Sequence, residues 1–317
     1  MANDCPLCAG AREKKELAPW RTWRWWDCAE CGIAFCTPFK NPGAGFYQDY
    51  ADLYPVEATG APDAMSFEYR ECLRSFSGSV DGKKLLDVGC GSGGFLNWAR
   101  KRGFTVTGLD FDAARLDLVK SKLRIFDVHQ GSLLDFLASH VGQNYDVVTM
   151  FQVLEHLDQP GAWLESAKIL LGPGGRLFLG TPNRDRTFDP FVDGMAQVDN
   201  PPNHLTRWRE SSLKAFLEKC GFKIVEIRSL PVPLPLYALM LRNKLRFGLA
   251  AQTLSAAQAS SEAPKTPSGK TGAVRTLVKI KEFLINALAW ISYPLFRAAF
   301  KILGWEGVVL YCVAEAK

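Results

Sequence analysis

The sequence lacks the features that mark membrane-spanning and secreted proteins. It has no uninterrupted apolar run of about 18 to 20 residues, the length that a spanning helix needs. The nearest candidate, 283–296, contains Asn286, Ser292 and Pro294. The first ten residues carry neither the basic segment nor the apolar segment of a secretory signal. We therefore expect a cytoplasmic protein, with peripheral contact at the inner face of a membrane as the alternative.

The chain also lacks a large net charge of either sign. The 317 residues carry a formal net charge of only +5, and hydrophobic and charged residues make up 47% and 22%. This balance is ordinary for a globular protein and excludes global disorder. The surplus is uneven, because residues 231–305 hold ten basic and two acidic side chains, a net of +8, and the remainder is slightly acidic. The total says little about partners, whereas the distribution sets residues 231–305 apart.

An even set of cysteines suited to disulfides is missing too. The nine cysteines are an odd number, and their arrangement fits a reducing compartment better than a disulfide framework. Four of them form two C-x-x-C pairs separated by 19 residues, a spacing expected of a structural zinc site. Metal binding at such a closed site would stabilise a module that has too small a hydrophobic core to fold by itself. The alternative interpretation is that the four cysteines are free thiols or contain a redox pair. The predicted Zn²⁺ ligands are Cys5, Cys8, Cys28 and Cys31.

The remaining chain alternates segments that resemble strands and helices. Strands are predicted at 84–88, 105–110, 145–151, 175–181, 222–229 and 307–315, and helices at 95–102, 113–123, 162–171 and 210–220. This alternation predicts an α/β fold with a doubly wound sheet and helices on both faces. We divide the chain into a zinc-ribbon module (1–40), a connecting helical or lid segment (41–80), a main domain (81–230), a basic helical insertion (231–305) with a flexible linker (252–272), and a final strand (306–317).

The clearest local signal is a glycine-rich turn after the first predicted strand, in residues 85–95. Glycines permit tight backbone angles and let a ligand approach the chain closely. Nicotinamide dehydrogenases hold a pyrophosphate on a similar turn, but Asp87 just ahead of the glycines would repel one. A carboxylate at this place could pair with the ammonium group of a methionine moiety. Asp110 ends the next strand, where it can accept hydrogen bonds from ribose hydroxyls.

These motifs, in this order, resemble class I S-adenosylmethionine-dependent methyltransferases over about 81–230 and the last strand. The resemblance rests on the residues at 87–93, 106–110, 145–157 and 171–181. It implies a Rossmann-like sheet of seven strands, the last one antiparallel, with the basic segment inserted between strands six and seven. The residues that it implies for binding S-adenosylmethionine are Asp87, Gly89, Cys90, Gly91, Gly93, Asp110, Phe111, Ser132, Leu133, Phe151 and Gln152.

The stretch after the second cysteine pair, at 32–38, 41–42 and 46–50, resembles a subfamily that fuses a zinc ribbon to this domain. Its members are often encoded with machinery for polysaccharides, lipid-linked glycans or modified sugars, which implies an acceptor of that kind. Three residues are candidates either for a lid over the cofactor cleft or for packing between module and domain: Tyr47, Tyr50 and Tyr54.

Methyl transfer requires alignment of the acceptor, and a hydroxyl or carbon acceptor must also lose a proton. His204, in the loop after the fifth strand, and then His156, just past the fourth, are the candidate general bases, because imidazole titrates near neutrality. A structural hydrogen-bonded histidine is the alternative for each. Quinone-type relatives bind a divalent ion through E-x-x-E-H. The first position is Gln152 in this chain, a poorer ligand for a hard cation, which argues against a catalytic magnesium.

The insertion carries apolar segments with lysines and arginines at 234–249 and 274–303. Basic amphipathic helices of this kind lie in membrane interfaces and favour anionic lipid; a cap over the acceptor site or a dimer contact is the alternative. The leading hypothesis is a methyltransferase for a small-molecule, sugar or lipid-linked glycan acceptor.

One alternative function is a zinc-ribbon RNA methyltransferase, because tryptophans and arginines alternate at 20–26 in a pattern that suits base stacking. The net charge of residues 1–40 is only +1, however, which is weak for phosphate binding. The other alternative is a non-catalytic, membrane-recruited scaffold, which the intact glycine motif argues against. The acceptor atom and the oligomeric state stay open.

Overall fold

The computed structural model describes residues 5–8, 14–17, 19–43, 45–46, 67–187, 199–238, 240–242 and 272–317, with only the backbone described at 14 and 272–282. It divides into two compact units. Residues 1–230 and 306–317 form the first, and residues 231–305 form the second. The three tyrosines proposed as a lid, and the linker up to residue 271, lie outside the described residues.

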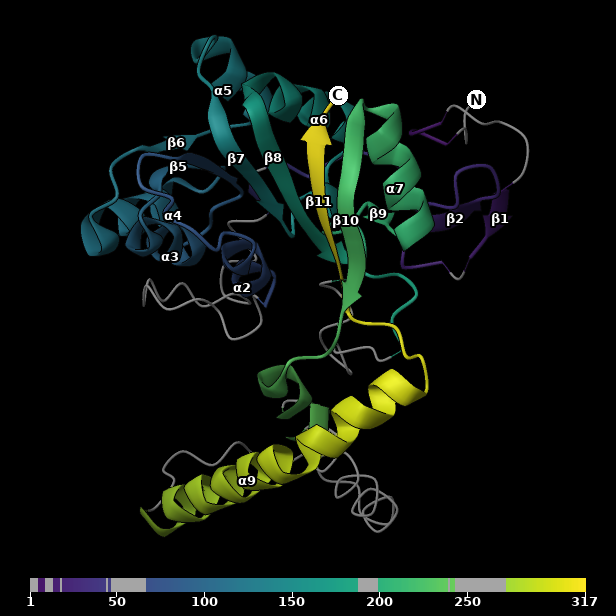
Figure 1. Ribbon diagram of the computed structural model, residues 1–317. Helices are drawn as coiled ribbons and strands as arrows, with labels where there is room; N and C mark the ends of the chain where they lie inside the picture. Colours follow the sequence, from purple (N-terminus) through teal and green to yellow (C-terminus); the bar gives the residue numbers. More distant parts are fainter. Residues whose placement is uncertain are drawn as a thin grey trace. The chain divides into compact units, whose positions relative to one another are not determined.

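A seven-stranded sheet is the framework of the first unit (Figure 1). Its strand order is β10-β11-β8-β7-β4-β5-β6. The central strands pair in parallel, whereas β11 is antiparallel to both of its neighbours. The predicted Rossmann-like fold with an antiparallel last strand is therefore confirmed. The strands are β4 (Lys84–Val88), β5 (Thr105–Asp110), β6 (Val128–Gln130), β7 (Tyr145–Phe151), β8 (Leu171–Pro182), β10 (Phe222–Leu230) and β11 (Val309–Ala316).

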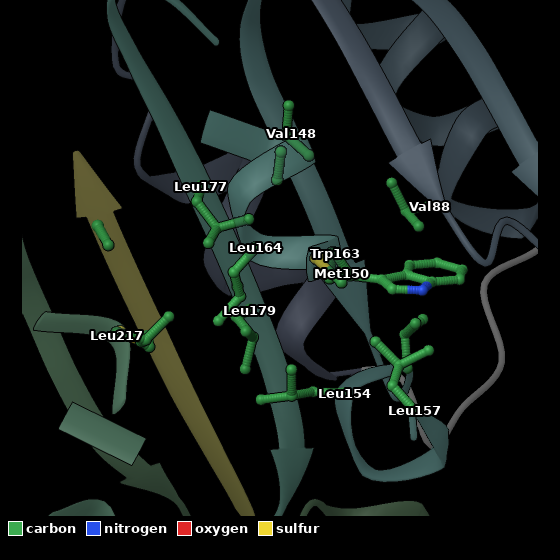
Figure 2. Packing of buried hydrophobic residues seen from close by; sticks show 14 of the residues in the cluster. Val88, Val148, Met150, Leu154, Leu157, Trp163, Leu164, Leu177, Leu179 and Leu217 are labelled. Atoms are coloured by element: carbon green, nitrogen blue, oxygen red, sulfur yellow. The ribbon is translucent and has the colours of Figure 1, made fainter. Parts of the chain in front are cut away.

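Helices cover both faces of this sheet. Because successive strand residues point to opposite faces, Leu86 and Leu85 belong to different apolar clusters. Figure 2 shows the first cluster, in which Trp163 and Leu164 pack near Met150 of β7. The first face carries α5 (Leu133–Ser139), α6 (Pro160–Leu170) and α7 (Glu210–Lys219). The second carries α2 (Phe67–Arg74), α3 (Gly94–Arg102) and α4 (Ala113–Leu118).

Each predicted strand and helix overlaps an observed one and differs from it at the ends, where assignments normally vary, whereas β6 and α5 were not among the predicted segments. One difference has a packing reason. The helix expected at 113–123 changes after Leu118 into a π-helical turn, η2 (Val119–Leu123). Val119 and Leu123 come so close to Gly93 that a Cβ atom there would lie 2.8 and 2.9 Å from their side chains. The π-helical turn thus packs directly against the glycine-rich turn.

The N-terminal module is joined to the main domain by a shared sheet. Its strands β1 (Lys14–Glu16), β2 (Arg24–Cys28) and β3 (Ala34–Thr37) form a four-stranded sheet with β9 (Thr206–Arg207). Cys5, Ile33 and Phe35 belong to the same apolar cluster as α6 and α7. Trp25 is only 1% exposed and is therefore not available for stacking on a base.

The second unit is organised around α9 (Gly272–Ile302). On one side of this helix, Phe296 stacks on Tyr237 with ring centroids 4.4 Å apart, and Tyr293 donates a hydrogen bond to the carbonyl of Val232. Within the described residues, the segment Phe283–Ile302 is long and apolar enough to cross a membrane. The segment is still interrupted by Asn286, Ser292 and Pro294 and is not an uninterrupted apolar run, but its length and its mean hydropathy of 1.3 are those of a candidate span.

Candidate functional site

The glycine-rich turn connects β4 to α3 through backbone angles that favour glycine. Gly89, Gly91 and Gly93 all have positive φ angles, of 76°, 52° and 76°. A Cβ atom on Gly89 would lie 2.5 Å from the side chain of Val153, so a larger residue does not fit. A Cβ atom on Gly91 would meet nothing closer than Arg115, at 3.7 Å. A Cβ atom at Gly91 would thus be in ordinary van der Waals contact with Arg115, and the positive φ angle is what favours glycine at this position.

Asp87 is a buried carboxylate at the end of β4, only 3% exposed. Its Oδ1 accepts a hydrogen bond of 2.7 Å from the hydroxyl of Thr149. Burial raises the pKa of Asp87 to about 7, although the hydrogen bond from Thr149 acts in the opposite direction. A cationic group beside this carboxylate would offset the cost of its burial. Asp87 is thus suited to the ammonium group of the cofactor's methionine moiety.

Asp110, at the end of β5, organises the glycine-rich turn. Its Oδ2 accepts the backbone N–H of Gly91 at 2.7 Å, and its Oδ1 accepts that of Asp112 at 2.9 Å. Burial raises the pKa of Asp110, and these two N–H groups oppose the rise. Each carboxylate oxygen has a second lone pair, which can accept a hydrogen bond from a ribose hydroxyl. The neighbouring Phe111 is 37% exposed.

Three other predicted cofactor residues use their side chains within the fold. Ser132 is the N-cap of α5, where its hydroxyl accepts from the N–H of Asp135 at 3.1 Å and donates to its carboxylate at 2.6 Å. Leu133 is fully buried and Cys90 is 6% exposed. Close contact of Ser132 or Leu133 with an adenine ring is therefore restricted mainly to the backbone.

Phe151 and Gln152 lie where β7 ends. The ring of Phe151 contacts Phe95 and Tyr69, with centroids 5.2 and 5.4 Å apart. Gln152 has a φ of 56°, which is rare for a residue with a side chain and is often found at functional sites. Its amide donates a 3.0 Å hydrogen bond to Glu68, a buried carboxylate of α2. Sequence analysis missed Glu68 and Tyr69, because α2 lies in the connecting segment and carries no motif.

The two predicted histidines lie together in the structure. Their rings pack edge to face with centroids 4.7 Å apart, although His204 comes from the loop before β9 and His156 from the 3₁₀ turn η3 (Leu154–His156). His204 is 5% exposed, and its Nδ1 contacts Asp199 Oδ1 at 3.2 Å. Burial acts to raise the pKa of Asp199, but His204 and Arg186 hold it well below its ordinary value. An ionised Asp199 accepts from Nδ1–H and leaves Nε2 of His204 as the basic nitrogen.

His156 is held in the same tautomer by a different partner. A carbonyl can only accept, so the 2.7 Å contact between its Nδ1 and the carbonyl of Asn203 places the proton on Nδ1. Burial lowers the pKa of His156 to about 3, so the ring is neutral. Its Nε2 lies 3.9 Å from Glu155 Oε1, and Nε2 of His204 lies 4.0 Å from the same atom.

Glu155 completes this cluster. It is 1% exposed, and burial raises its pKa to about 7. Its Oε2 accepts a hydrogen bond of 3.1 Å from Thr181, whereas its Oε1 is buried and has no hydrogen-bond partner among the described residues. Such an unsatisfied buried oxygen is costly unless a donor reaches it. This oxygen and the two Nε2 atoms therefore lie within 4.8 Å of one another, an arrangement that suits a shared proton, held by Glu155 itself or by a bound hydroxyl, or a cation. Asp199 was not predicted, although it lies five residues before His204.

The four predicted zinc ligands also lie together. Cys5 Sγ is 3.6 Å from Cys31 Sγ, and Cys8 Sγ is 3.6 Å from Cys28 Sγ. All four sulfurs lie within 4.8 Å of one another. Sulfurs around a tetrahedral zinc ion with bonds of 2.3 Å are about 3.8 Å apart. These cysteines thus have the spacing and the chemistry that a structural Zn²⁺ ion needs.

Comparisons with known proteins agree with this geometry. Ubiquinone biosynthesis O-methyltransferases of Klebsiella pneumoniae and Escherichia coli are 40% and 39% identical to the chain over 114 residues, which is 34% of this chain. The chain matches about half of the length of these curated relatives, 46% and 47%. A chain from the complex between the Haloferax volcanii Trm112 methyltransferase activator and its methyltransferase has a similar fold. It is 16% identical, with a TM-score of 0.50 over 84% of this chain and 96% of that one.

The family assignment rests on a longer match. A family model described as a methyltransferase domain matches residues 66–227, slightly more than half of the chain. This range includes the glycine-rich turn, both carboxylates at the strand ends and the Glu155–His156 turn. The chain therefore belongs to this methyltransferase family, as a class I enzyme that depends on S-adenosylmethionine.

Proposed function

We propose that the enzyme methylates a hydroxyl group of a small molecule, a sugar or a lipid-linked glycan, with His204 as the general base. The observation that carries this proposal is the convergence of Nε2 of His204, Nε2 of His156 and the unsatisfied Oε1 of Glu155. The hydroxyl group of an acceptor can donate a hydrogen bond to these atoms, and O-methylation requires that this hydroxyl lose its proton. The names of the relatives from Klebsiella pneumoniae and Escherichia coli describe O-methyltransferases, which supports this class of acceptor.

The cofactor supplies the reactive methyl group, and the chain supplies binding and alignment. Asp87 would hold the ammonium group of the methionine moiety, and Asp110 the ribose hydroxyls. Gly89, Gly91 and Gly93 would shape the turn against the cofactor. Phe111, Phe151, Gln152 and the backbone at Ser132 and Leu133 would form the remaining walls, while the side chain of Cys90 is buried in the second apolar cluster.

The acceptor side would hold and move one proton. Asp199 fixes Nδ1–H of His204, so Nε2 can take the proton of the acceptor hydroxyl, and the negative charge of Asp199 would stabilise the imidazolium that forms. His156, which is neutral and half-buried, would accept a hydrogen bond from the acceptor, but its lowered pKa makes it a poor general base and leaves His204 as the candidate for proton removal. Glu155 would balance the positive charge that develops on His204.

The test measures the two sides separately. His204→Ala and Asp199→Asn should lose methyl transfer from S-adenosylmethionine to a panel of sugar and quinol acceptors, as measured by mass spectrometry. Calorimetry should show that both variants keep the cofactor affinity of the wild type. His129→Ala is the matched control, because His129 lies on β6 and pairs with Asp127. Full activity of His204→Ala would overturn the role of the base. If a chelator abolishes wild-type activity and a divalent cation restores it, a metal ion and not a proton lies between the three atoms.

We also propose that the cysteine module binds one structural Zn²⁺ ion through Cys5, Cys8, Cys28 and Cys31, as a zinc ribbon at 1–40 followed by a connecting segment. Metal analysis of the purified protein should find about one zinc per chain. A folded protein without metal would contradict this proposal.

A membrane surface is the proposed partner of the second unit. Leu284, Leu288, Ile291 and Leu295 follow one another at helical spacing on α9 and are 47% to 76% exposed, which makes one apolar face. Exposed Trp290 adds an aromatic ring, and residues 231–305 carry a net charge of +8. An apolar face within a strongly basic segment fits the interface of an anionic bilayer better than a neutral protein surface.

Flotation with vesicles tests this proposal. The full chain should float with vesicles that contain about one third phosphatidylglycerol and not with phosphatidylcholine alone, and the double variant Leu288→Glu/Ile291→Glu should not float. Val141→Glu is the control, since Val141 is also an exposed apolar residue, more exposed than Leu288 and Ile291, but lies in the first unit. Equal flotation of all forms, or a dimer that the double variant separates, would overturn membrane binding by this face.

A further inference from the structure

We infer that the N-terminal module, together with Asn41 at the start of the connecting segment, positions both histidines of the acceptor site, so that Trp25, Asn41 and the strand β3 act on methyl transfer through His204 and His156. The inference rests on the proposed function of these histidines. It assigns the module a role beyond its own folding and beyond metal binding. Three sets of contacts carry it, and all of them lie within the first unit.

The first contact consists of two backbone hydrogen bonds of Leu205, the residue after His204. The N–H of Leu205 donates to the carbonyl of Glu155 at 2.8 Å, and its carbonyl accepts the N–H of Cys36, in β3, at 3.0 Å. The pairing continues as Ala34 with Arg207 and Phe35 with Thr206. Leu205 is fully buried. The chain beside His204 is thus clamped between a strand of the module and the turn that carries Glu155.

The second contact acts on the partner of His204. The guanidinium of Arg207 lies over the ring of Trp25, 4.3 Å from its centroid. The same guanidinium donates to the carbonyl of Asp199 at 3.0 Å and to the side chain of Asn200 at 2.8 Å. The indole N–H of Trp25 donates to that same Asn200 oxygen at 3.3 Å. Trp25 therefore supports the segment from which Asp199 orients the imidazole of His204.

The third contact acts on His156. The side-chain amide of Asn41 donates to the carbonyl of His156 at 2.8 Å, and the backbone N–H of Asn41 donates to Asp158 at 3.0 Å. Asn41 thus holds the turn on both sides of Leu157, which is itself buried. Because the imidazole is fixed at its other side by Asn203, a shift of this turn would change the distance between His156 and Glu155.

The cofactor side is held by different residues. The hydrogen bonds of Asp87 and Asp110 run to Thr149, Gly91 and Asp112, in β7, the glycine turn and the residue that caps α4. Loosening the module should therefore disturb the acceptor site and leave the cofactor pocket in place. A misplacement of a reacting group by about 1 Å can cost on the order of 100-fold in rate, so Asn41→Ala and Trp25→Ala should lower kcat about 10- to 100-fold.

The experiment uses the full chain and a readout that does not need activity. The sequence has four histidines, and their ring signals can be followed by NMR after ¹⁵N labelling. Asn41→Ala should shift the ring signals of His156, and Trp25→Ala those of His204, while His129 and His140 stay unchanged as internal references. Lys40→Ala is the matched control, because Lys40 is exposed and precedes Asn41. Trp25→Phe should restore much of the kcat, since phenylalanine retains a ring beneath Arg207.

The outcomes separate this inference from the proposed function. Shifted signals of His156 and His204, with an unchanged cofactor affinity and zinc content, support the positioning role. If all four histidine signals stay in place in Asn41→Ala and in Trp25→Ala, the inference is overturned, even if activity falls. The role of His204 as the base is judged by His204→Ala alone, so failure of the proposed function is recognised independently.

Discussion

The proposed cofactor side and the proposed acceptor side of this enzyme are built in different ways. The proposed cofactor side comes mostly from one continuous strand–turn–helix–strand unit, which holds Asp87, Gly91 and Asp110 and in which Gly91 donates a hydrogen bond to Asp110. The acceptor side is assembled from three distant segments that contain Asn41, Glu155 and His204. A local site can be recognised from a motif, whereas an assembled site depends on how the whole unit packs.

The largest expected effect concerns the acceptor side alone. His204→Ala should lower kcat by about 10²- to 10⁴-fold, the usual contribution of a general base, with little change in the dissociation constant for S-adenosylmethionine. Single-turnover rates and calorimetry on the same preparations measure both quantities. If the affinity for the cofactor falls in parallel with kcat, the two sides are not separable as we describe them.

Asp87→Asn should act in the opposite way. Removing the charge that faces the ammonium group should weaken cofactor binding by about 100-fold or more, in line with the ~3–5 kcal/mol cost of leaving a buried charge unpaired. The ring signals of His156 and His204 should not move. Without cofactor the variant should melt at a higher temperature than wild type, because the burial cost of Asp87 is removed. An unchanged cofactor affinity would contradict the assignment of Asp87.

The pH dependence of cofactor binding gives a sharper test of the same carboxylate. The pKa of Asp87 is raised from 3.8 to about 7 in the free protein, and binding of the ammonium group requires the ionised form. As the pH falls below 7, binding must first remove a proton, so the affinity should drop by up to about tenfold per pH unit. Above pH 7 the affinity should level off. Calorimetry between pH 5 and 8 should show this slope in wild type and not in Asp87→Asn.

The free protein should show the matching effect on stability. A carboxyl group whose folded pKa is raised contributes stability while it is protonated, and this contribution is lost as the pH rises from about 4 to 7. Bound cofactor should recover it above pH 7. Thermal melting with and without S-adenosylmethionine should therefore show a larger stabilisation at pH 8 than at pH 6.

The smallest expected effect concerns Ser132. Because its hydroxyl caps α5, Ser132→Ala should lower the free energy of unfolding by about 1 kcal/mol and leave cofactor affinity nearly unchanged. Denaturant unfolding and calorimetry check the two parts. A tenfold loss of affinity without loss of stability would show that the hydroxyl binds the cofactor directly.

Much of the cofactor side could be predicted from sequence. The order of strands and helices, the glycine turn and the two carboxylates at the strand ends follow from short-range patterns, and the spacing of the four cysteines predicted that they would gather. The residues that escaped prediction have no local signal. Glu68 reaches Gln152 across 84 positions of the chain, and Thr149 reaches Asp87 through the pairing of β7 with β4. Asp199 acquires its role only because its loop folds back onto His204.

The amino-acid order was sufficient for the fold class, the cofactor and the candidate histidines, because turns, strand alternation and ligand spacing are properties of neighbouring residues. Packing was needed to show that the cysteine module shares a sheet with β9 and that Asn41, directly after it, donates a hydrogen bond to the carbonyl of His156. It was also needed to show that α9 leaves one apolar side exposed. Such features depend on contacts between residues far apart in the chain, and these form only when the separate elements bury their apolar faces together.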